Sequence, residues 1–245
     1  MVQWIRSLIF VAQIYAMMIV IGLGFLPFAA FSRRAARLAC KTYSRWVFWT
    51  MSWMVGIKHE VRGTPPEGQV LIAAKHQSFL DIMMIFTALP EAKFIMKKEI
   101  LWTPIIGLYA MRLDCVAVDR GKRGAAIEKM LKDVSTGKVH PGQLIIYSQG
   151  TRVAPGVRMP YKVGSHALYA QLQQPCVPVA TNVGLFWPRK GIWRKPGVAV
   201  VEFLDPIAPG KDKASFMSEL ETRVEAASNA LMAEAGFDAQ NHQSG

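Results

Sequence analysis

Residues 7 to 32 contain no charged side chain, and this run constrains the fold of the chain more than any other feature. Residues 7 to 26 alone could form a helix about 30 Å long, which matches the hydrocarbon thickness of a bilayer. We expect Pro27 to end or kink that helix, because its ring removes a backbone donor. An uncharged run of this length at one end of a chain favours a membrane-embedded helix over a helix buried in a soluble core.

The segment after the apolar run is basic and aromatic. Its basic residues recur at helical spacing and predict one charged face: Arg34, Arg37, Lys41 and Arg45. Tryptophans, which are enriched at membrane interfaces, follow at the same spacing: Trp46, Trp49 and Trp53. Two topologies fit, either a single span with the basic cluster inside or a helical hairpin that enters one leaflet and returns. In both, residues 1–57 are expected to anchor the protein.

Charge and apolar content together indicate a lipid partner. The net charge is +12 at pH 7, and 51% of the 245 residues are hydrophobic. Nucleic-acid-binding proteins share this charge but rarely this apolar content, so we expect no nucleic-acid partner and instead an anionic bilayer or anionic lipids. The three cysteines form no CxxC pair and the histidines show no ligand spacing, so we predict no metal site.

Strand-like and helix-like segments alternate from residue 58 onward. Apolar runs predict strands near 58–62, 69–75, 93–96, 115–118, 143–148, 176–182 and 198–203. Helical patterns lie near 78–89, 99–112, 122–137, 162–173 and 214–235. The alternation predicts an α/β domain over residues 58–235, with a mixed, largely parallel sheet flanked by helices, and a flexible tail at 236–245. Pro178 is expected at an edge or at the start of its strand.

His76 and Asp81 are the candidate catalytic pair. Five residues apart in one regular helix they would point in different directions, so the simplest arrangement puts His76 in a turn after a strand and Asp81 in the next helix. A carboxylate bonded to one ring nitrogen fixes the tautomer, which lets the other nitrogen take a proton from a hydroxyl. The sequence has no GxSxG elbow, so this hydroxyl is expected to belong to a substrate.

Two further segments follow predicted strands and carry arginines that could bind phosphate. Arg120 ends one strand, and Gln149-Gly150-Thr151-Arg152 is a turn whose glycine lets the backbone approach an anion. Sheets of this kind bind ligands at the carboxyl ends of their strands, so His76, Arg120 and this turn are expected to converge on one site.

In this order the motifs resemble the glycerolipid acyltransferase family, and above all its bacterial members that acylate 1-acylglycerol-3-phosphate. The first family block falls on His76 and Asp81, and the third, usually Glu-Gly-Thr-Arg, falls on residues 149–152. The second block looks like Lys98, Gly107 and Arg120, the fourth falls on 177–180, and a further family stretch resembles Tyr161-Lys162-Val163-Gly164. The resemblance covers roughly residues 55 to 205.

The resemblance implies transfer of a fatty acyl group from acyl-CoA or acyl carrier protein to the sn-2 hydroxyl of 1-acyl-glycerol-3-phosphate, which gives phosphatidic acid. His76 would be the general base, oriented by Asp81. The groups that would hold the acceptor phosphate are Arg120, Gly150, Thr151 and Arg152. No cofactor is implied beyond the thioester co-substrate. The implied partners are the bilayer, a lysophospholipid acceptor and the acyl donor, at the cytoplasmic side of a bacterial inner membrane.

Two residues depart from the family pattern, since Lys75 replaces an asparagine and Gln149 replaces a glutamate. They predict a pocket with one more positive charge and one fewer negative charge. The additional candidate substrate contacts are Lys75, Lys98, Gln149 and Lys162. The acceptor could therefore be a different lysolipid, such as a lyso-ornithine lipid or a lysophospholipid.

Two functions outside acyl transfer also fit a membrane-bound chain of this composition. One is hydrolysis of thioesters or lipids at the membrane, and the missing GxSxG elbow weighs against it. The second is lipid binding without catalysis, and the intact His76 and Asp81 weigh against that.

Overall fold

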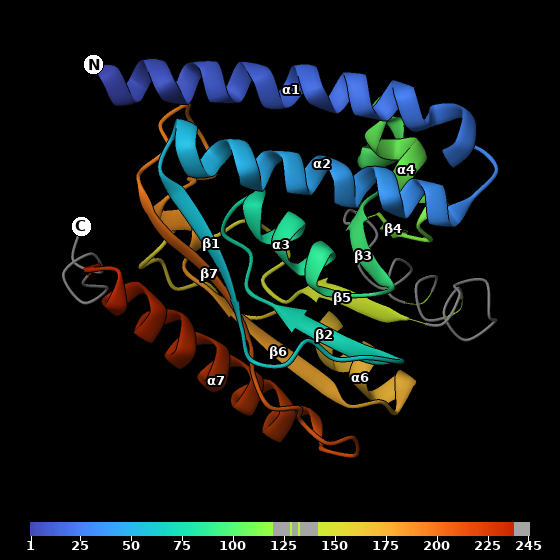
Figure 1. Ribbon diagram of the computed structural model, residues 1–245. Coiled ribbons are helices and arrows are strands. Elements are labelled where there is room, and N and C mark those ends of the chain that lie inside the picture. Colours follow the sequence, from blue (N-terminus) through green and yellow to red (C-terminus); the bar gives the residue numbers. More distant parts are fainter. Residues whose placement is uncertain (120–127, 129–131, 133–141, 238–245) are drawn as a thin grey trace.

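The computed structural model describes residues 1–119, 128, 132 and 142–237 (Figure 1). In this part of the chain one 7-stranded sheet has the order β1-β7-β6-β2-β5-β3-β4. Only the β6–β7 pair is antiparallel among the described strands. The strands are β1 (Ile57–Arg62), β2 (Val70–Ala74), β3 (Ala92–Lys97), β4 (Val116–Val118), β5 (Gln143–Tyr147), β6 (Cys176–Thr181) and β7 (Gly197–Phe203). The predicted α/β class with a mixed, largely parallel sheet is confirmed.

Helices cover both faces of the sheet (Figure 1). One face carries α1 (Val2–Ala29), α2 (Arg33–Met54) and α3 (Leu80–Ala88), and the other carries α6 (Gly164–Leu172) and α7 (Lys213–Glu234). The connections include η1 (Lys98–Trp102), α4 (Ile106–Arg112) and η2 (Val183–Leu185). The alternation of side chains along β2 separates the two cores, because Ile72 and Ala74 join the first face while Leu71 and Ala73 join the second.

α1 and α2 form an antiparallel hairpin along one side of the domain (Figure 1). Ser32 begins α2 as its N-cap and accepts from the Ala35 N–H at 3.3 Å. Polar groups bridge the two helices, since Trp46 Nε1 donates to Gln13 Oε1 at 2.8 Å and Gln13 Nε2 donates to Thr50 Oγ1 at 3.0 Å. The hairpin is therefore fixed by specific contacts as well as by apolar packing.

The N-terminal half of α1 is built into the α/β domain. Gln3 Nε2 donates to the carbonyls of Val55 at 3.0 Å and Arg194 at 2.8 Å. Phe10 is fully buried and packs edge-on against Trp187, with ring centroids 5.5 Å apart. The proposed boundary at residue 57 therefore separates segments that share one apolar core.

Two details differ from expectation, and a third falls outside the described residues. α1 continues through Pro27 and ends two residues later at Ala29, although the proline cannot donate the backbone hydrogen bond of its position. The predicted basic face of α2 is divided: Arg37 forms an ion pair with Glu91, and Lys41 Nζ donates to the Leu89 carbonyl at 3.0 Å, so these two cations face the domain. The predicted helix at 122–137 falls almost entirely outside the described residues, as does most of the 236–245 tail.

Pro178 occupies an interior strand, so the expectation of an edge or a strand start is wrong. The β6–β7 pairing stops at Val179 opposite Phe203, and a separate bridge joins Cys176 to Ile207. Pro178 lies between these two points, where the ladder is interrupted, and its carbonyl accepts from the Leu204 N–H at 3.0 Å. Because the β6–β7 ladder is interrupted here, the missing backbone N–H of the proline leaves no ladder hydrogen bond to β7 unmade.

Two glycines with the same backbone conformation test the packing at the end of β1. Gly63 (φ +71) and Gly68 (φ +73) both adopt the left-handed region. A Cβ on Gly63 would lie 2.0 Å from the Phe203 carbonyl oxygen, whereas a Cβ on Gly68 would meet nothing within 4 Å. Gly63→Ala should therefore reduce the free energy of unfolding by roughly 2 kcal/mol more than Gly68→Ala, measured by urea denaturation in detergent. Equal losses would contradict this packing.

Candidate active site

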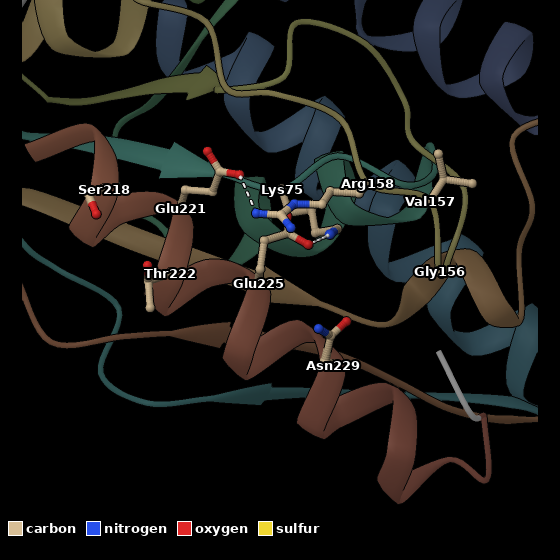
Figure 2. A pocket seen from close by; sticks show the side chains of 9 residues that line it. All are labelled: Lys75, Gly156, Val157, Arg158, Ser218, Glu221, Thr222, Glu225 and Asn229. Atoms are coloured by element: carbon tan, nitrogen blue, oxygen red, sulfur yellow. Dashed lines mark hydrogen bonds and ion pairs between the residues drawn. The ribbon is translucent and has the colours of Figure 1, made fainter. Parts of the chain in front are cut away.

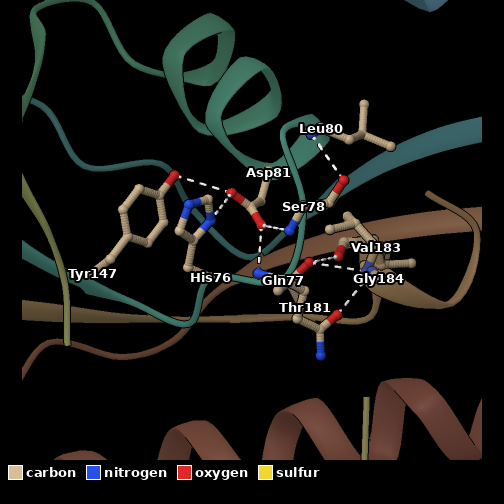
Figure 3. Close-up of polar contacts among 10 residues, drawn as sticks. His76, Gln77, Ser78, Leu80, Asp81, Tyr147, Thr181, Val183 and Gly184 are labelled. Carbon is tan, nitrogen blue, oxygen red and sulfur yellow. Dashed lines mark hydrogen bonds and ion pairs between the residues drawn. The ribbon is translucent and has the colours of Figure 1, made fainter. Parts of the chain in front are cut away.

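His76 and Asp81 meet at the carboxyl end of the central strand β2 (Figure 3). β2 ends at Ala74 and α3 begins at Leu80, so the intervening turn folds the histidine back over the start of the helix. His76 Nδ1 and Asp81 Oδ1 are 2.8 Å apart. The predicted strand–turn–helix arrangement is therefore present. The His76 side chain is 13% exposed and Asp81 is fully buried, so only the histidine can reach a ligand.

The Asp81 carboxylate is held by backbone donors of the same turn. Its Oδ2 accepts from the N–H groups of Gln77 and Ser78, each at 2.8 Å. Asp81 is also the second residue of α3, where the helix dipole favours negative charge. Because a carboxylate only accepts, Nδ1 of His76 must be the donor of their shared hydrogen bond. Nε2 is thereby the ring nitrogen that can accept a proton from a ligand.

Tyr147, at the end of β5, completes this arrangement, and the sequence motifs gave no indication of it. Its ring stacks on His76 with centroids 3.9 Å apart and planes 18° apart, and its hydroxyl donates to Asp81 Oδ1 at 3.1 Å (Figure 3). Burial first, and the Asp81 charge second, raise the pKa of Tyr147 well above its usual value, so the hydroxyl stays a donor. The tyrosine directly precedes residues 148–152, but the sequence does not show that β5 lies beside β2.

An apolar cavity of about 440 Å³ includes His76, Tyr147 and Arg152 in its lining. The rest of the wall comes mainly from apolar side chains of α1, α2, α3, β3 and α4, so the cavity lies between the helical hairpin and the sheet. Gly22 of α1 lines it opposite Ile105, and a Cβ on Gly22 would lie 2.5 Å from Ile105 Cγ2. Ile105 has a positive φ of 64°, a strained conformation for a β-branched residue.

The turn at residues 149–152 is joined directly to the His76 turn, because the Val153 N–H donates to the His76 carbonyl at 2.8 Å. Gly150 has φ +70, and its N–H closes the turn by donating to the Tyr147 carbonyl at 2.8 Å. That N–H is thus already engaged, which differs from the expected donation to a phosphate. A Cβ on Gly150 would lie 2.8 Å from Lys162 Nζ, so the lysine covers the turn.

The remaining predicted contacts are distributed differently from expectation. Lys75 points to the opposite face of the sheet and pairs with Glu225, so the prediction that it adds a charge to this cavity is wrong. Gln149 is fully buried, and its Nε2 donates to the Met159 carbonyl at 3.1 Å. Lys98 is exposed on η1 and its neighbour Lys97 lines the cavity. Arg120 lies outside the described residues.

No group of three or more His, Cys, Asp or Glu side chains in the described part of the chain is placed to hold a metal ion. The site presents an oriented imidazole beside a buried carboxylate, with a guanidinium on the same cavity wall. Such a site can accept a proton from a hydroxyl and bind an anionic group nearby.

Residues 57–182 match the model of the Acyltransferase family. The 1-acyl-sn-glycerol-3-phosphate acyltransferase of Pseudomonas aeruginosa is 28% identical over 241 residues, which cover 95% of this chain and 92% of that protein. The human 1-acyl-sn-glycerol-3-phosphate acyltransferase alpha is 32% identical, over 54% of this chain and 48% of its own length.

Among solved structures, the 1-acyl-sn-glycerophosphate (LPA) acyltransferase of Thermotoga maritima has the same fold. The TM-score is 0.79 over 94% of this chain and 98% of that chain, at 20% sequence identity. The coverage includes the helical hairpin as well as the sheet.

Proposed function

The chain belongs to the Acyltransferase family, and from this membership we propose that it transfers a fatty acyl group from acyl-CoA or acyl carrier protein to the sn-2 hydroxyl of 1-acyl-glycerol-3-phosphate. The product would be phosphatidic acid. The observation that carries the proposal is the His76–Asp81 pair, 2.8 Å apart, on the wall of an apolar cavity that also includes Arg152. The names of the relatives support the same acceptor.

In the proposed mechanism His76 Nε2 takes the proton of the acceptor hydroxyl as its oxygen attacks the thioester carbonyl. Asp81 stabilises the imidazolium that forms, and the tetrahedral intermediate collapses with loss of the thiolate. The imidazolium then returns its proton to the thiolate, which balances the reaction. The thioester is already activated and the acceptor is the nucleophile, so positioning and one general base supply the catalysis.

The cavity suits the acyl chain and the arginine suits the phosphate. A long hydrocarbon chain is stabilised by burial against apolar walls, and α1 and α2 of the hairpin supply part of these walls. Arg152 is positioned to bind the acceptor phosphate beside the base, with Thr151 and Lys162 adjacent in the same turn and loop. Arg120 remains a proposed phosphate ligand on the strength of the resemblance.

We infer that α1 lies in one leaflet and does not cross the membrane. It is long and apolar enough to span by length and composition. However, one face packs on α2 and the domain, while the opposite face exposes an apolar row along the helix: Trp4, Ile5, Leu8, Ile9, Ile19, Val20 and Leu23. A helix packed along a domain cannot leave it to cross a bilayer, so the hairpin is favoured over the single span. We propose the inner membrane, with the site on the cytoplasmic side.

The sequence argument for lyso-ornithine lipid, or for a lysophospholipid other than 1-acyl-glycerol-3-phosphate, as the acceptor is weakened by the structure. It rested on Lys75 and Gln149, and neither residue is among those that line the cavity with His76. Product analysis tests the function itself: purified protein with a radiolabelled acyl donor should acylate 1-acyl-glycerol-3-phosphate in preference to lyso-ornithine lipid and to other lysophospholipids. Free fatty acid as the sole product would instead indicate a hydrolase.

His76→Ala should reduce acyl transfer by about 10²–10⁴-fold, because the general base is lost. Binding of the lysolipid should remain, since His76 supplies no charge to the phosphate. The rate with saturating donor and acceptor is the measurement. Turnover near that of the wild type would contradict the mechanism.

Arg152→Ala should raise the acceptor KM by about 10–100-fold, the effect of losing a charge-assisted hydrogen bond. An acceptor that lacks phosphate should show no such change. Arg158→Ala provides the control, because its side chain is 80% exposed and is not part of the cavity wall. An equal effect of the two substitutions would argue against a phosphate site at Arg152.

Gly22→Leu should shift the preference toward shorter acyl donors, because a side chain there would enter the cavity beside Ile105. The ratio of kcat/KM for a long donor to that for a short donor should fall at least about tenfold. Gly24→Leu is the matched control on the same helix, since a Cβ there meets nothing within 4 Å. An unchanged ratio in Gly22→Leu would show that this wall does not contact the acyl chain.

The full chain should stay with membranes in high salt and be released by detergent, because apolar burial holds it. Reporters fused to residue 1 and to the C-terminus should both lie on the cytoplasmic side. A periplasmic residue 1 would instead support the single span.

A further inference from the structure

Lys75 is the residue directly before His76, and its side chain points to the opposite face of the sheet. It continues the alternation of Leu71 and Ala73, which face the core under α7. Lys75 is 2% exposed, and its Nζ lies 2.6 Å from Glu225 Oε2 of α7 (Figure 2). A cation is thus buried one residue away from the proposed base, in a contact that the mechanism does not use.

Glu225 links Lys75 to a second segment, because Tyr161 Oη donates to Glu225 Oε1 at 3.0 Å. Tyr161 closes the loop that starts at the Gly150–Arg152 turn, and the next residue returns to β5, where the Lys162 N–H donates to the Ser148 carbonyl at 2.8 Å. Burial first, then Glu225, raises the pKa of Tyr161, so its hydroxyl remains a donor. One carboxylate therefore holds the end of β2 and the end of this loop together.

We propose that Lys75, Glu225 and Tyr161 form a positioning network that holds the His76 turn and the Gly150–Arg152 turn in register from the far face of the sheet. The inference rests on the proposed function, since it assigns these turns to the base and to the phosphate. A buried ion pair contributes little to the net free energy of unfolding, but separating its two charges is energetically costly. Such a pair can therefore hold two segments in a fixed relative position. The Val153 N–H···His76 carbonyl bond joins the same two turns directly.

The Lys75–Glu225 ion pair lies at the edge of a groove, and removing either charge offers a test of the network. A polar groove of about 500 Å³ lies against it, lined among others by Arg158, Glu221 and Asn229 (Figure 2). The Glu225 side chain is 21% exposed at this groove, whereas the Lys75 side chain is 2% exposed. Water can therefore solvate the carboxylate in part, but the ammonium is stabilised mainly by Glu225. In the described part of the chain, Asp81 and Tyr147 contact His76 directly. The other charged or titratable groups on the wall of its cavity are Arg152, Lys97, Tyr43, Tyr109, Cys40 and Cys115. Removal of one partner leaves the remaining charge unbalanced behind the imidazole.

The test compares Lys75→Met, Glu225→Gln and the double variant by NMR titration of the His76 ring, assigned with His76→Ala, in the detergent-solubilised chain. Lys75→Met removes a cation and leaves an anion, so the titration midpoint of His76 should rise by about half a pH unit. Glu225→Gln leaves the buried cation alone, so the midpoint should fall by a similar amount, and the double variant should return close to the wild type. Both single variants should also lower kcat about tenfold or more, because displaced groups react slowly.

Arg158→Met and Glu221→Gln are the matched controls, because this pair lies on the same groove at 3.8 Å and is more exposed to solvent than Lys75 and Glu225. They should leave the midpoint and kcat near wild-type values. Shifts of the same sign in Lys75→Met and Glu225→Gln, or kcat values equal to those of the controls, would overturn the network. A wild-type chain that transfers no acyl group would refute the proposed function instead, and the titration would still decide the network.

Discussion

The Asp81 carboxylate is the interaction on which the site depends. It accepts hydrogen bonds from His76 Nδ1, from the backbone of Gln77 and Ser78, and from the Tyr147 hydroxyl. A fully buried charge is costly unless such donors surround it, and here they come from the β2–α3 turn and from β5. The same bonds that stabilise the carboxylate therefore fix the tautomer and the plane of the imidazole. A change in the turn, the helix start or the neighbouring strand would displace the proposed base.

The helical hairpin connects this polar centre to an exposed apolar surface. Its inner side supplies walls of the apolar cavity, and its outer side is an exposed apolar surface. Aromatic rings continue from α1 toward the turn that carries His76, since Trp187 contacts Phe10 at 5.5 Å and Phe79 at 6.4 Å between centroids. Phe79 is the residue before α3 and lines the cavity. One continuous core thus couples α1 to the helix that carries Asp81.

Local patterns in the sequence predict much of this arrangement. The strand expected near 58–62 is Ile57–Arg62, and the spacing of His76 and Asp81 requires the turn that the structure contains. Long-range contacts are not encoded in such patterns. Tyr147 acts on His76 because β5 is the neighbour of β2, an order that the sequence does not reveal. Lys75 looked like a pocket residue, but its partner Glu225 lies 150 residues away. Likewise, helical spacing places Arg37 and Lys41 on one face of α2 without showing that this face turns inward.

The central claim is that the Asp81 charge orients and stabilises His76 as the base, and Asp81→Asn tests it most directly. Asparagine keeps the size of the side chain but removes the negative charge, and its amide can favour the wrong tautomer of the ring. We predict a fall in kcat of about 10²–10⁴-fold with the acceptor KM nearly unchanged, measured by acyl transfer to 1-acyl-glycerol-3-phosphate. A folded Asp81→Asn variant with wild-type kcat would contradict the account.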